Sequence, residues 1–200
     1  MVYIVGLGPG HRDYILPKAI EVMKNCDLIL GFKRALESLE FIDNKKEAKA
    51  TLKDIIEILE KDSNKIIALV ASGDPNFYGI TDYINRNYSG EVQVIPGISS
   101  YQYLMSKINK SWQNAYLSSV HGREEDFVTK VREYKKSIWL TDKERNPKAL
   151  CKLLIENQVS CEVVVGENLS YENEKITAGC PKDIVEGDYS NLSVIYIERH

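Results

Sequence analysis

The sequence lacks any apolar run of the roughly 18 residues that a membrane-spanning helix needs. Its first residues, "MVYIVGLGPG", also carry no basic segment of the kind that opens a secretory signal. Both absences argue against a membrane or secreted protein. We expect a cytoplasmic protein with no membrane partner.

Closely spaced metal ligands and disulfide-type cysteine patterns are also missing. The cysteines are Cys26, Cys151, Cys161 and Cys180, with no C-x-x-C pair, and the chain has only three histidines. Structural zinc sites and disulfide frameworks show characteristic ligand spacings. We therefore expect reduced thiols that fill space, and no protein-bound metal.

Basic residues are not in excess, since the formal net charge is −3. A general nucleic-acid binder normally carries a basic surplus, so we expect no nucleic-acid partner, although a local basic pocket stays open. Lysines do cluster over residues 45–53, but acidic residues are interleaved with them there. This pattern is typical of a solvated helix face.

The glycine-rich start of the chain does not complete a dinucleotide-binding fingerprint. Gly6, Gly8 and Gly10 give G-x-G-x-G, and the place of the third fingerprint glycine is taken by His11. Pro9 removes one N–H that would face a phosphate. The next apolar run, "DLILGF", does not end in the acidic residue that would bind a ribose. These departures argue against a nicotinamide cofactor.

A hydrolytic triad is equally poorly supported. His121 lies near Ser118 and Ser119 in the sequence, but no G-x-S-x-G motif is present. Closeness in sequence does not establish triad geometry, which depends on the fold. The residue pattern therefore does not favour hydrolysis.

Short Ile-, Val- and Leu-rich runs alternate with amphipathic stretches, which predicts an α/β fold. Thr51 is a candidate N-cap, with Asp54 at the capping-box position. In the first half, strands are expected at 2–6, 27–31, 65–71 and 91–95, and helices at 16–25, 51–61 and 79–88. This alternation predicts a largely parallel sheet.

The pattern restarts after residue 110, which suggests a first domain over 1–110 and a second over 111–200. The connection at 181–191, between the last two expected strands, is too short for a long crossover helix, so the second sheet should be mixed with antiparallel edges. Strands are expected at 115–120, 137–141, 161–166, 174–178 and 192–198. We expect two α/β domains with a cleft between them.

Three expected strands of the first half end in loops of small residues, at 6–10, 71–79 and 96–100. Each loop alone is an ordinary turn or helix start. In parallel sheets, however, ligands bind outside the carboxyl ends of the strands, where such loops would gather. Their combination predicts a ligand site that includes the Asp74 carboxylate.

The motifs "VGLGPG", "SGDPNFYG" and "PGISS" stand in these three loops, and in this order they resemble the tetrapyrrole methylases. The resemblance runs over essentially the whole chain. It implies that two α/β domains enclose S-adenosylmethionine as methyl donor, that the substrate is a macrocycle, and that the protein is a homodimer.

Four further motifs, at 31–37, 118–123, 140–147 and 166–176, resemble the family members that methylate C5 of cobalt-precorrin-7 in anaerobic cobalamin biosynthesis. The "HGR" of 121–123 is the most telling of these. The resemblance also implies that a separate protein carries the C15-methylating, decarboxylating activity with which this enzyme is fused in some organisms.

The resemblance implies roles for individual residues. Donor-binding residues would be Pro9, Gly73, Asp74, Tyr78, Ser99, Ser100, Thr141, Asn168 and Leu169. The carboxylates of the macrocycle would be bound by Arg12, Lys33, Arg34 and Arg123. Arginine suits carboxylates because its guanidinium forms paired hydrogen bonds. The pair His121 and Arg123 is expected in catalysis, with His121 as a possible proton acceptor.

Two kinds of alternative stay open at this point. Within the family, the chain could methylate another ring position, or act on diphthamide or ribosomal RNA. Outside enzymes, the same glycine loops could form a nucleotide-binding module that does not turn its ligand over.

Overall fold

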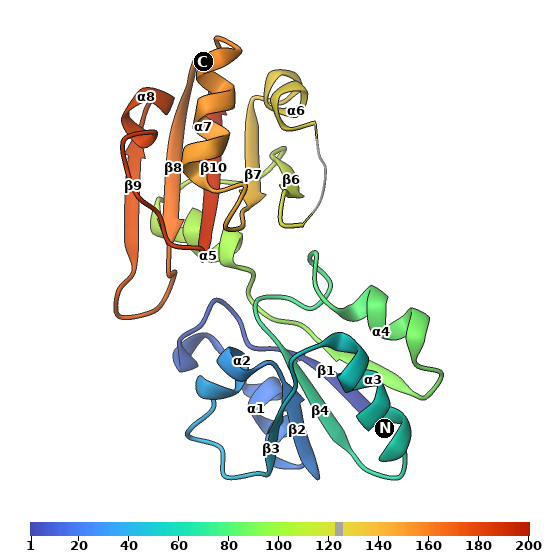
Figure 1. Ribbon diagram of the computed structural model, residues 1–200. Helices are drawn as coiled ribbons and strands as arrows, with labels where there is room; N and C mark the ends of the chain where they lie inside the picture. The colour runs from blue at the N-terminus through green and yellow to red at the C-terminus, as the bar shows by residue number, and fades with distance from the viewer. Residues whose placement is uncertain (123–125) are drawn as a thin grey trace. The chain divides into compact units, whose positions relative to one another are not determined.

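Apolar runs form the strands of two five-stranded sheets in the computed structural model, which describes residues 1–122 and 126–200. The sheets belong to two units of the chain, Met1–Ser99 and Ser100–His200 (Figure 1). The strands of the first unit are β1 (Val2–Gly6), β2 (Leu28–Gly31), β3 (Lys46–Ala48), β4 (Ile67–Ala71) and β5 (Val92–Ile95). Its helices are η1 (Arg12–Tyr14), α1 (Pro17–Lys24), α2 (Lys33–Glu37), α3 (Leu52–Lys61) and α4 (Thr81–Asn87).

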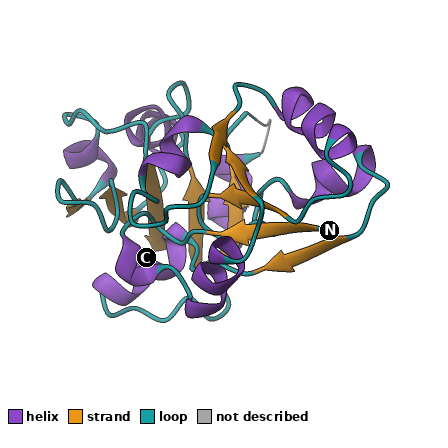
Figure 2. Ribbon diagram, turned by 90° about the horizontal axis from the view of Figure 1, so that it is seen from below, coloured by secondary structure: helices purple, strands orange, loops and turns teal. Residues whose placement is uncertain are grey.

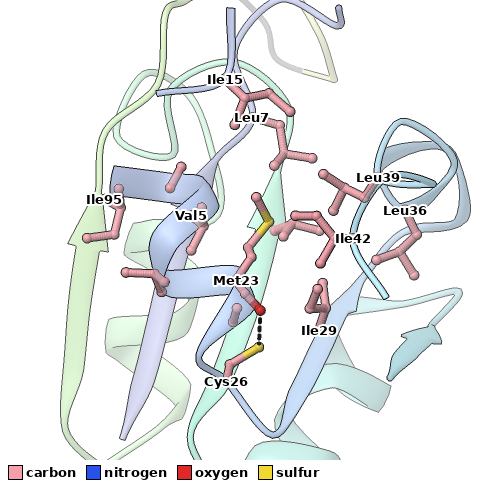
Figure 3. Packing of buried hydrophobic residues seen from close by; sticks show 14 residues of the cluster. Val5, Leu7, Ile15, Met23, Cys26, Ile29, Leu36, Leu39, Ile42 and Ile95 are labelled. Carbon is pink, nitrogen blue, oxygen red and sulfur yellow. Dashed lines mark hydrogen bonds between the residues drawn. The ribbon is translucent and has the colours of Figure 1, made fainter. Parts of the chain in front are cut away.

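The first sheet is parallel throughout, in the order β3-β2-β4-β1-β5. Successive side chains of a strand point to opposite faces. On one face, Val5 and Val70 pack with Met23 of α1 (Figure 3). On the other, Ile4 and Leu69 pack with residues of α3 and α4. Figure 2 shows helices on both sides of the strands near the N-terminus, which confirms the α/β prediction.

Helix α3 begins as the sequence predicts. The Asp54 N–H donates to Thr51 Oγ1 at 3.1 Å, and the Thr51 N–H donates to Asp54 Oδ2 at 3.2 Å. This reciprocal pair satisfies two N–H groups that the first turn of a helix leaves open. The apolar side of the helix is held by Ile55 and Leu59, both fully buried.

The interpretation of 45–53 as a helix face is wrong for its first part, because α3 begins only at Leu52. Residues Lys46–Ala48 form β3, which pairs with β2 at the edge of the first sheet. Charged side chains are common on edge strands because they discourage pairing with another chain. Lys49 Nζ lies 2.7 Å from Glu47 Oε1, and this ion pair lies at the same edge strand. The interleaved charges of this segment therefore belong to an edge strand.

The second unit holds a mixed sheet in the order β6-β7-β10-β8-β9. Its strands are β6 (Tyr116–Ser119), β7 (Lys136–Leu140), β8 (Cys161–Glu167), β9 (Lys175–Gly179) and β10 (Ser193–Arg199). Its helices are α5 (Ser100–Lys107), α6 (Phe127–Glu133), α7 (Pro147–Glu156) and α8 (Pro181–Ile184). Strand β6 runs parallel to β7, while β10 is antiparallel to both its neighbours and β9 is antiparallel to β8. The prediction of a mixed sheet is confirmed.

The structural division of the chain falls between Ser99 and Ser100, earlier than the expected boundary after residue 110. Residues 100–110 pack with the second sheet, where Leu104 lies against Gly166 of β8. Lys110 forms ion pairs with Glu162 at 2.8 Å and Glu198 at 2.7 Å. The polar segment 109–114 therefore follows a helix that already belongs to the second unit.

The Lys110 ion pairs predict an acid-sensitive contribution to stability. The hydrogen bond from Lys110 holds the pKa of Glu198 below its ordinary value. That contribution is therefore present above the unfolded-state pKa of about 4.3 and is lost as the pH falls through the lower folded-state pKa. We expect Lys110→Met to reduce the free energy of unfolding at pH 7 by about 1 kcal/mol.

Urea denaturation at several pH values measures this effect. The difference from the parent chain should shrink as the pH falls below about 4. Lys152→Met is the control, because Lys152 is an exposed lysine of α7 for which no ion pair is found in the described chain. An equal loss for Lys110→Met at pH 3 and pH 7 would contradict the prediction.

Three of the four cysteines fill core space as predicted, but Cys180 does not. Cys26, Cys151 and Cys161 are buried, and burial raises the pKa of Cys151 to about 12 and that of Cys161 to about 11. Cys180 is exposed at the N-cap of α8. Among the described residues, no group of three His, Cys, Asp or Glu is placed to hold a metal ion.

Candidate functional site

The three glycine-rich loops of the first unit meet at one edge of its sheet. They follow β1, β4 and β5, which are adjacent and parallel, so their carboxyl ends lie together as predicted. The chain leaves β1 toward α1 on one face and leaves β4 toward α4 on the other. In open α/β sheets, ligands bind where neighbouring connections diverge in this way.

Backbone contacts hold these loops against one another. The Gly73 N–H donates to Gly8 O at 2.8 Å, and the Gly8 N–H donates to Gly73 O at 3.2 Å. A Cβ on Gly97 would lie 2.1 Å from Gly73 O, and one on Gly6 would lie 2.6 Å from the Gly97 nitrogen. Most of these glycines therefore allow the loops to pack closely against one another.

Gly73 provides room for a ligand beside the backbone. Its φ of +66° is costly for residues with a side chain, and a Cβ there would meet only the Cα of Ser99, at 3.9 Å. Pro9 and Ser99 are buried in the neighbouring loops, whereas Tyr78, with φ +51°, is 40% exposed. These loops therefore offer backbone groups that a ligand could approach beside Gly73.

The Asp74 carboxylate joins two of the loops. Oδ1 accepts the Asn76 N–H at 2.7 Å, and Oδ2 accepts the Gly97 N–H at 3.3 Å. Asp74 thus caps its own turn and ties it to the loop after β5. Binding of the donor by this carboxylate stays a prediction, since these bonds alone give Asp74 a structural role.

Predicted macrocycle-binding residues of the first unit lie beyond the carboxyl ends of β1 and β2. The Arg12 guanidinium lies over the Phe41 ring, 4.7 Å from its centroid. Lys33 and Arg34 are exposed in α2, and Lys33 is 4.0 Å from Glu37. The exposed ring of Phe32 precedes them. The sequence thus places cations and an aromatic surface near one sheet edge.

Predicted residues of the second unit also share one edge of their sheet. Strands β6, β7 and β8 run in the same direction, and His121, Thr141 and Asn168 follow their respective carboxyl ends. Thr141 is 5% exposed, and its hydroxyl donates to Ser193 O at 2.8 Å. Leu169 is buried beside Gly166. The hydrogen bond of the Thr141 hydroxyl thus links the end of β7 to the start of β10.

His121 has a defined tautomer. Its Nδ1 lies 3.3 Å from the carbonyl oxygen of Thr141, so Nδ1 carries a proton and Nε2 is the basic nitrogen. Beside it, burial opposes the charge of Asp142, but N–H groups of Arg145, Gly122 and Glu144 outweigh this and lower the pKa of Asp142. The exposed imidazole can accept a proton at Nε2.

Two predicted residues remain, Ser100 and Arg123. Ser100 opens α5 and belongs to the second unit. Arg123 lies outside the described residues. Three residues that hold the loops at this edge were not predicted from the sequence: Asp142, Ser190 and Ser193. Asp142 lies inside the motif at 140–147, whereas nothing in the sequence indicated a role for the two serines.

The family model described as Tetrapyrrole (Corrin/Porphyrin) Methylases matches residues 1–184. The chain belongs to the tetrapyrrole methylase family.

Relatives within the family match over their full length. A protein of Methanocaldococcus jannaschii named probable cobalt-precorrin-7 C(5)-methyltransferase is 36% identical, over 99% of this chain and 98% of the relative. The cobalt-precorrin-7 C(5)-methyltransferase of Salmonella typhimurium is 30% identical over all of both chains. A Sinorhizobium precorrin-6Y C(5,15)-methyltransferase [decarboxylating] is 29% identical, and the match covers 98% of this chain but 48% of that protein.

Solved structures share the fold. The precorrin-6Y methylase of Archaeoglobus fulgidus matches with a TM-score of 0.80 at 24% identity, covering 100% of this chain and 98% of that one. A uroporphyrin-III C-methyl transferase of Thermus thermophilus, complexed with S-adenyl homocysteine, matches with a TM-score of 0.80 at 18% identity, over 98% and 96% of the two chains. At these identities the likeness concerns the fold.

Proposed function

We propose that this chain transfers a methyl group from S-adenosylmethionine to C5 of cobalt-precorrin-7 in cobalamin biosynthesis. The observation that carries the proposal is the 36% identity over almost the whole length of a relative named for this reaction. A second relative named for the same reaction also matches from end to end. Tetrapyrrole methylases use this methyl donor. A Cβ at Gly73 would meet only the Cα of Ser99, so the backbone there is open to a ligand.

When bound, S-adenosylmethionine supplies a methyl group already activated by its sulfonium. The protein then has to position the reactants, and good alignment is worth roughly 7–11 kcal/mol of the barrier. In the first unit, Pro9, Gly73 and Ser99 would form the backbone wall, with Tyr78 and Asp74 beside it. In the second unit, Thr141, Asn168 and Leu169 would contact the donor.

His121 is the proposed proton acceptor. When the ring carbon of the macrocycle has been methylated, a proton must leave the product. The contact of Nδ1 with the Thr141 carbonyl leaves Nε2 as the basic nitrogen. Its exposure lets a proton donor reach it. Proton transfer at this nitrogen would complete the reaction.

The macrocycle carries acetate and propionate carboxylates around an apolar ring, and it brings any cobalt with it. Arg12, Lys33 and Arg34 offer positive charges for the carboxylates. The ring of Phe32 offers an apolar surface at the same sheet edge. We assign these residues to macrocycle binding.

Replacing Arg12 should therefore weaken macrocycle binding. We expect Arg12→Ala to raise the KM for the macrocycle about tenfold, because a charged hydrogen bond is worth roughly 1.5–3 kcal/mol. The KM for S-adenosylmethionine should not change. Steady-state kinetics measures both constants, and Arg86→Ala is the control, since Arg86 is an exposed arginine of α4 near Asp82. An unchanged macrocycle KM would remove Arg12 from the assignment.

The assembly and its pathway neighbour follow from the same resemblance. We propose that the chain forms a homodimer. We further propose that a C15-methylating, decarboxylating activity works in the same pathway, because the Sinorhizobium protein, of which this chain matches 48%, is named for both positions. Size-exclusion chromatography with light scattering tests the first of these proposals.

Titration calorimetry with S-adenosylmethionine, S-adenosylhomocysteine, NAD and ATP tests the choice of ligand. The proposal predicts binding of the two sulfur nucleosides. Binding of NAD or ATP alone would discard the methylase function and favour a nucleotide-binding module.

A further inference from the structure

The segment before β10 links the ends of β7 and β8. At the end of β8, the Asn168 N–H donates to Leu192 O at 2.9 Å, and Glu167 Oε1 accepts the Ser190 N–H at 2.7 Å. Glu167 is only 5% exposed, so this bond lies within the protein. Ser190 is thereby held beside Asn168, which the resemblance places among the donor-binding residues.

The Ser190 hydroxyl fixes the orientation of the Asn168 amide. Its oxygen accepts the Leu192 N–H at 3.2 Å and lies 2.8 Å from Asn168 Oδ1, to which it donates. A hydroxyl has one proton to give, and the amide oxygen is the acceptor that uses it. The Asn168 NH₂ group then faces away from Ser190. Within the described chain, no protein acceptor is found for this NH₂.

Backbone geometry holds the same residue. Asn168 has a φ of +45°, in the left-handed region that asparagine tolerates better than most residues. Its carbonyl accepts the Tyr171 N–H at 3.0 Å. The side chain is half-buried. A hydrogen-bond donor is thus presented in a fixed direction at the edge of the sheet.

We propose that Ser190 is a positioning residue for donor binding. It orients Asn168 so that the NH₂ group meets a hydrogen-bond acceptor of the bound nucleoside, either a ring nitrogen or a ribose oxygen. This inference rests on the proposed function, because it takes S-adenosylmethionine as the ligand. It adds that Asn168 is the hydrogen-bond donor in this contact and that Ser190 fixes its orientation.

Calorimetry with S-adenosylhomocysteine tests the proposal on the full chain. We expect Ser190→Ala to raise the Kd about 3- to 10-fold, the range for one neutral hydrogen bond. Ser190→Thr keeps the hydroxyl and should restore binding. Asn168→Asp keeps the oxygen that faces Ser190 but replaces the outward NH₂ by an acceptor, so its Kd should rise about tenfold or more. Ser106→Ala, which removes a hydroxyl bonded within α5, is the control.

A double-mutant comparison separates positioning from a general structural role. If Ser190 acts through Asn168, Ser190→Ala should have no further effect on the Kd in an Asn168→Ala background. In turnover, the KM for the donor should rise while kcat and the macrocycle KM stay unchanged.

Two results would overturn the inference alone. One is an unchanged Kd for Ser190→Ala, and the other is the same rise in Kd for Ser190→Ala in the parent and Asn168→Ala backgrounds. Failure of the parent chain itself to bind S-adenosylhomocysteine would overturn the proposed function and this inference with it.

Discussion

Gly97→Ala is expected to lower the free energy of unfolding by about 3 kcal/mol and to abolish measurable donor binding. An added Cβ would lie 2.1 Å from Gly73 O and 3.0 Å from two Gly6 backbone atoms. Overpacking of this kind typically costs about 1–3 kcal/mol, and backbone atoms cannot rotate away as a side chain can. The loops after β1, β4 and β5 must move apart to admit the methyl group. This movement displaces the backbone at Gly73 that is proposed to contact the donor.

Chemical denaturation and calorimetry with S-adenosylhomocysteine measure the two effects of Gly97→Ala. Gly90→Ala is the matched control in the same unit, because the atoms closest to its added Cβ belong to the flexible side chain of Tyr88. We expect the control to change donor binding little. A Gly97→Ala variant with the stability and affinity of the parent would show that the loops are not packed as described.

His121→Asn is expected to lower kcat by about 10²- to 10⁴-fold, the usual contribution of a general acid or base. Asparagine offers an amide N–H for the Thr141 carbonyl but has no basic nitrogen in the place of Nε2. The stability of the protein and its affinity for S-adenosylhomocysteine should change little. The loss therefore tests proton acceptance rather than folding.

Single-turnover kinetics with labelled donor measures this loss at the chemical step. His200→Asn is the control, since His200 is the exposed last residue of the chain. Partial recovery of His121→Ala by added imidazole would support a proton acceptor at this position. A kcat for His121→Asn equal to that of the parent would remove His121 from the mechanism.

Much of the fold follows from local sequence signals. Apolar runs bounded by turn residues predicted nine of the ten strands found in the described residues, because buried strands are rich in apolar residues. The Thr51 capping box gave the start of α3. Strand β3 was missed because an edge strand buries little, so its charges have the pattern of a solvated helix.

The candidate site was only partly predictable. The meeting of the three loops followed from the rule for parallel sheets, and the structure confirms it. The role of Asp74 as a link between loops could not be foreseen, because its partner Gly97 is distant in sequence. The role of Ser190 could not be predicted either, because its hydrogen bond to Asn168 depends on the pairing of β8 with β10.

Methyl transfer to C5 of cobalt-precorrin-7 can be observed with the purified chain. The purified chain is incubated with ¹³C-methyl-labelled S-adenosylmethionine and cobalt-precorrin-7, and the labelled carbon is located by NMR. We expect one labelled methyl group, at C5. Label at another ring position, or no transfer to this substrate by a chain that binds the donor, would contradict it.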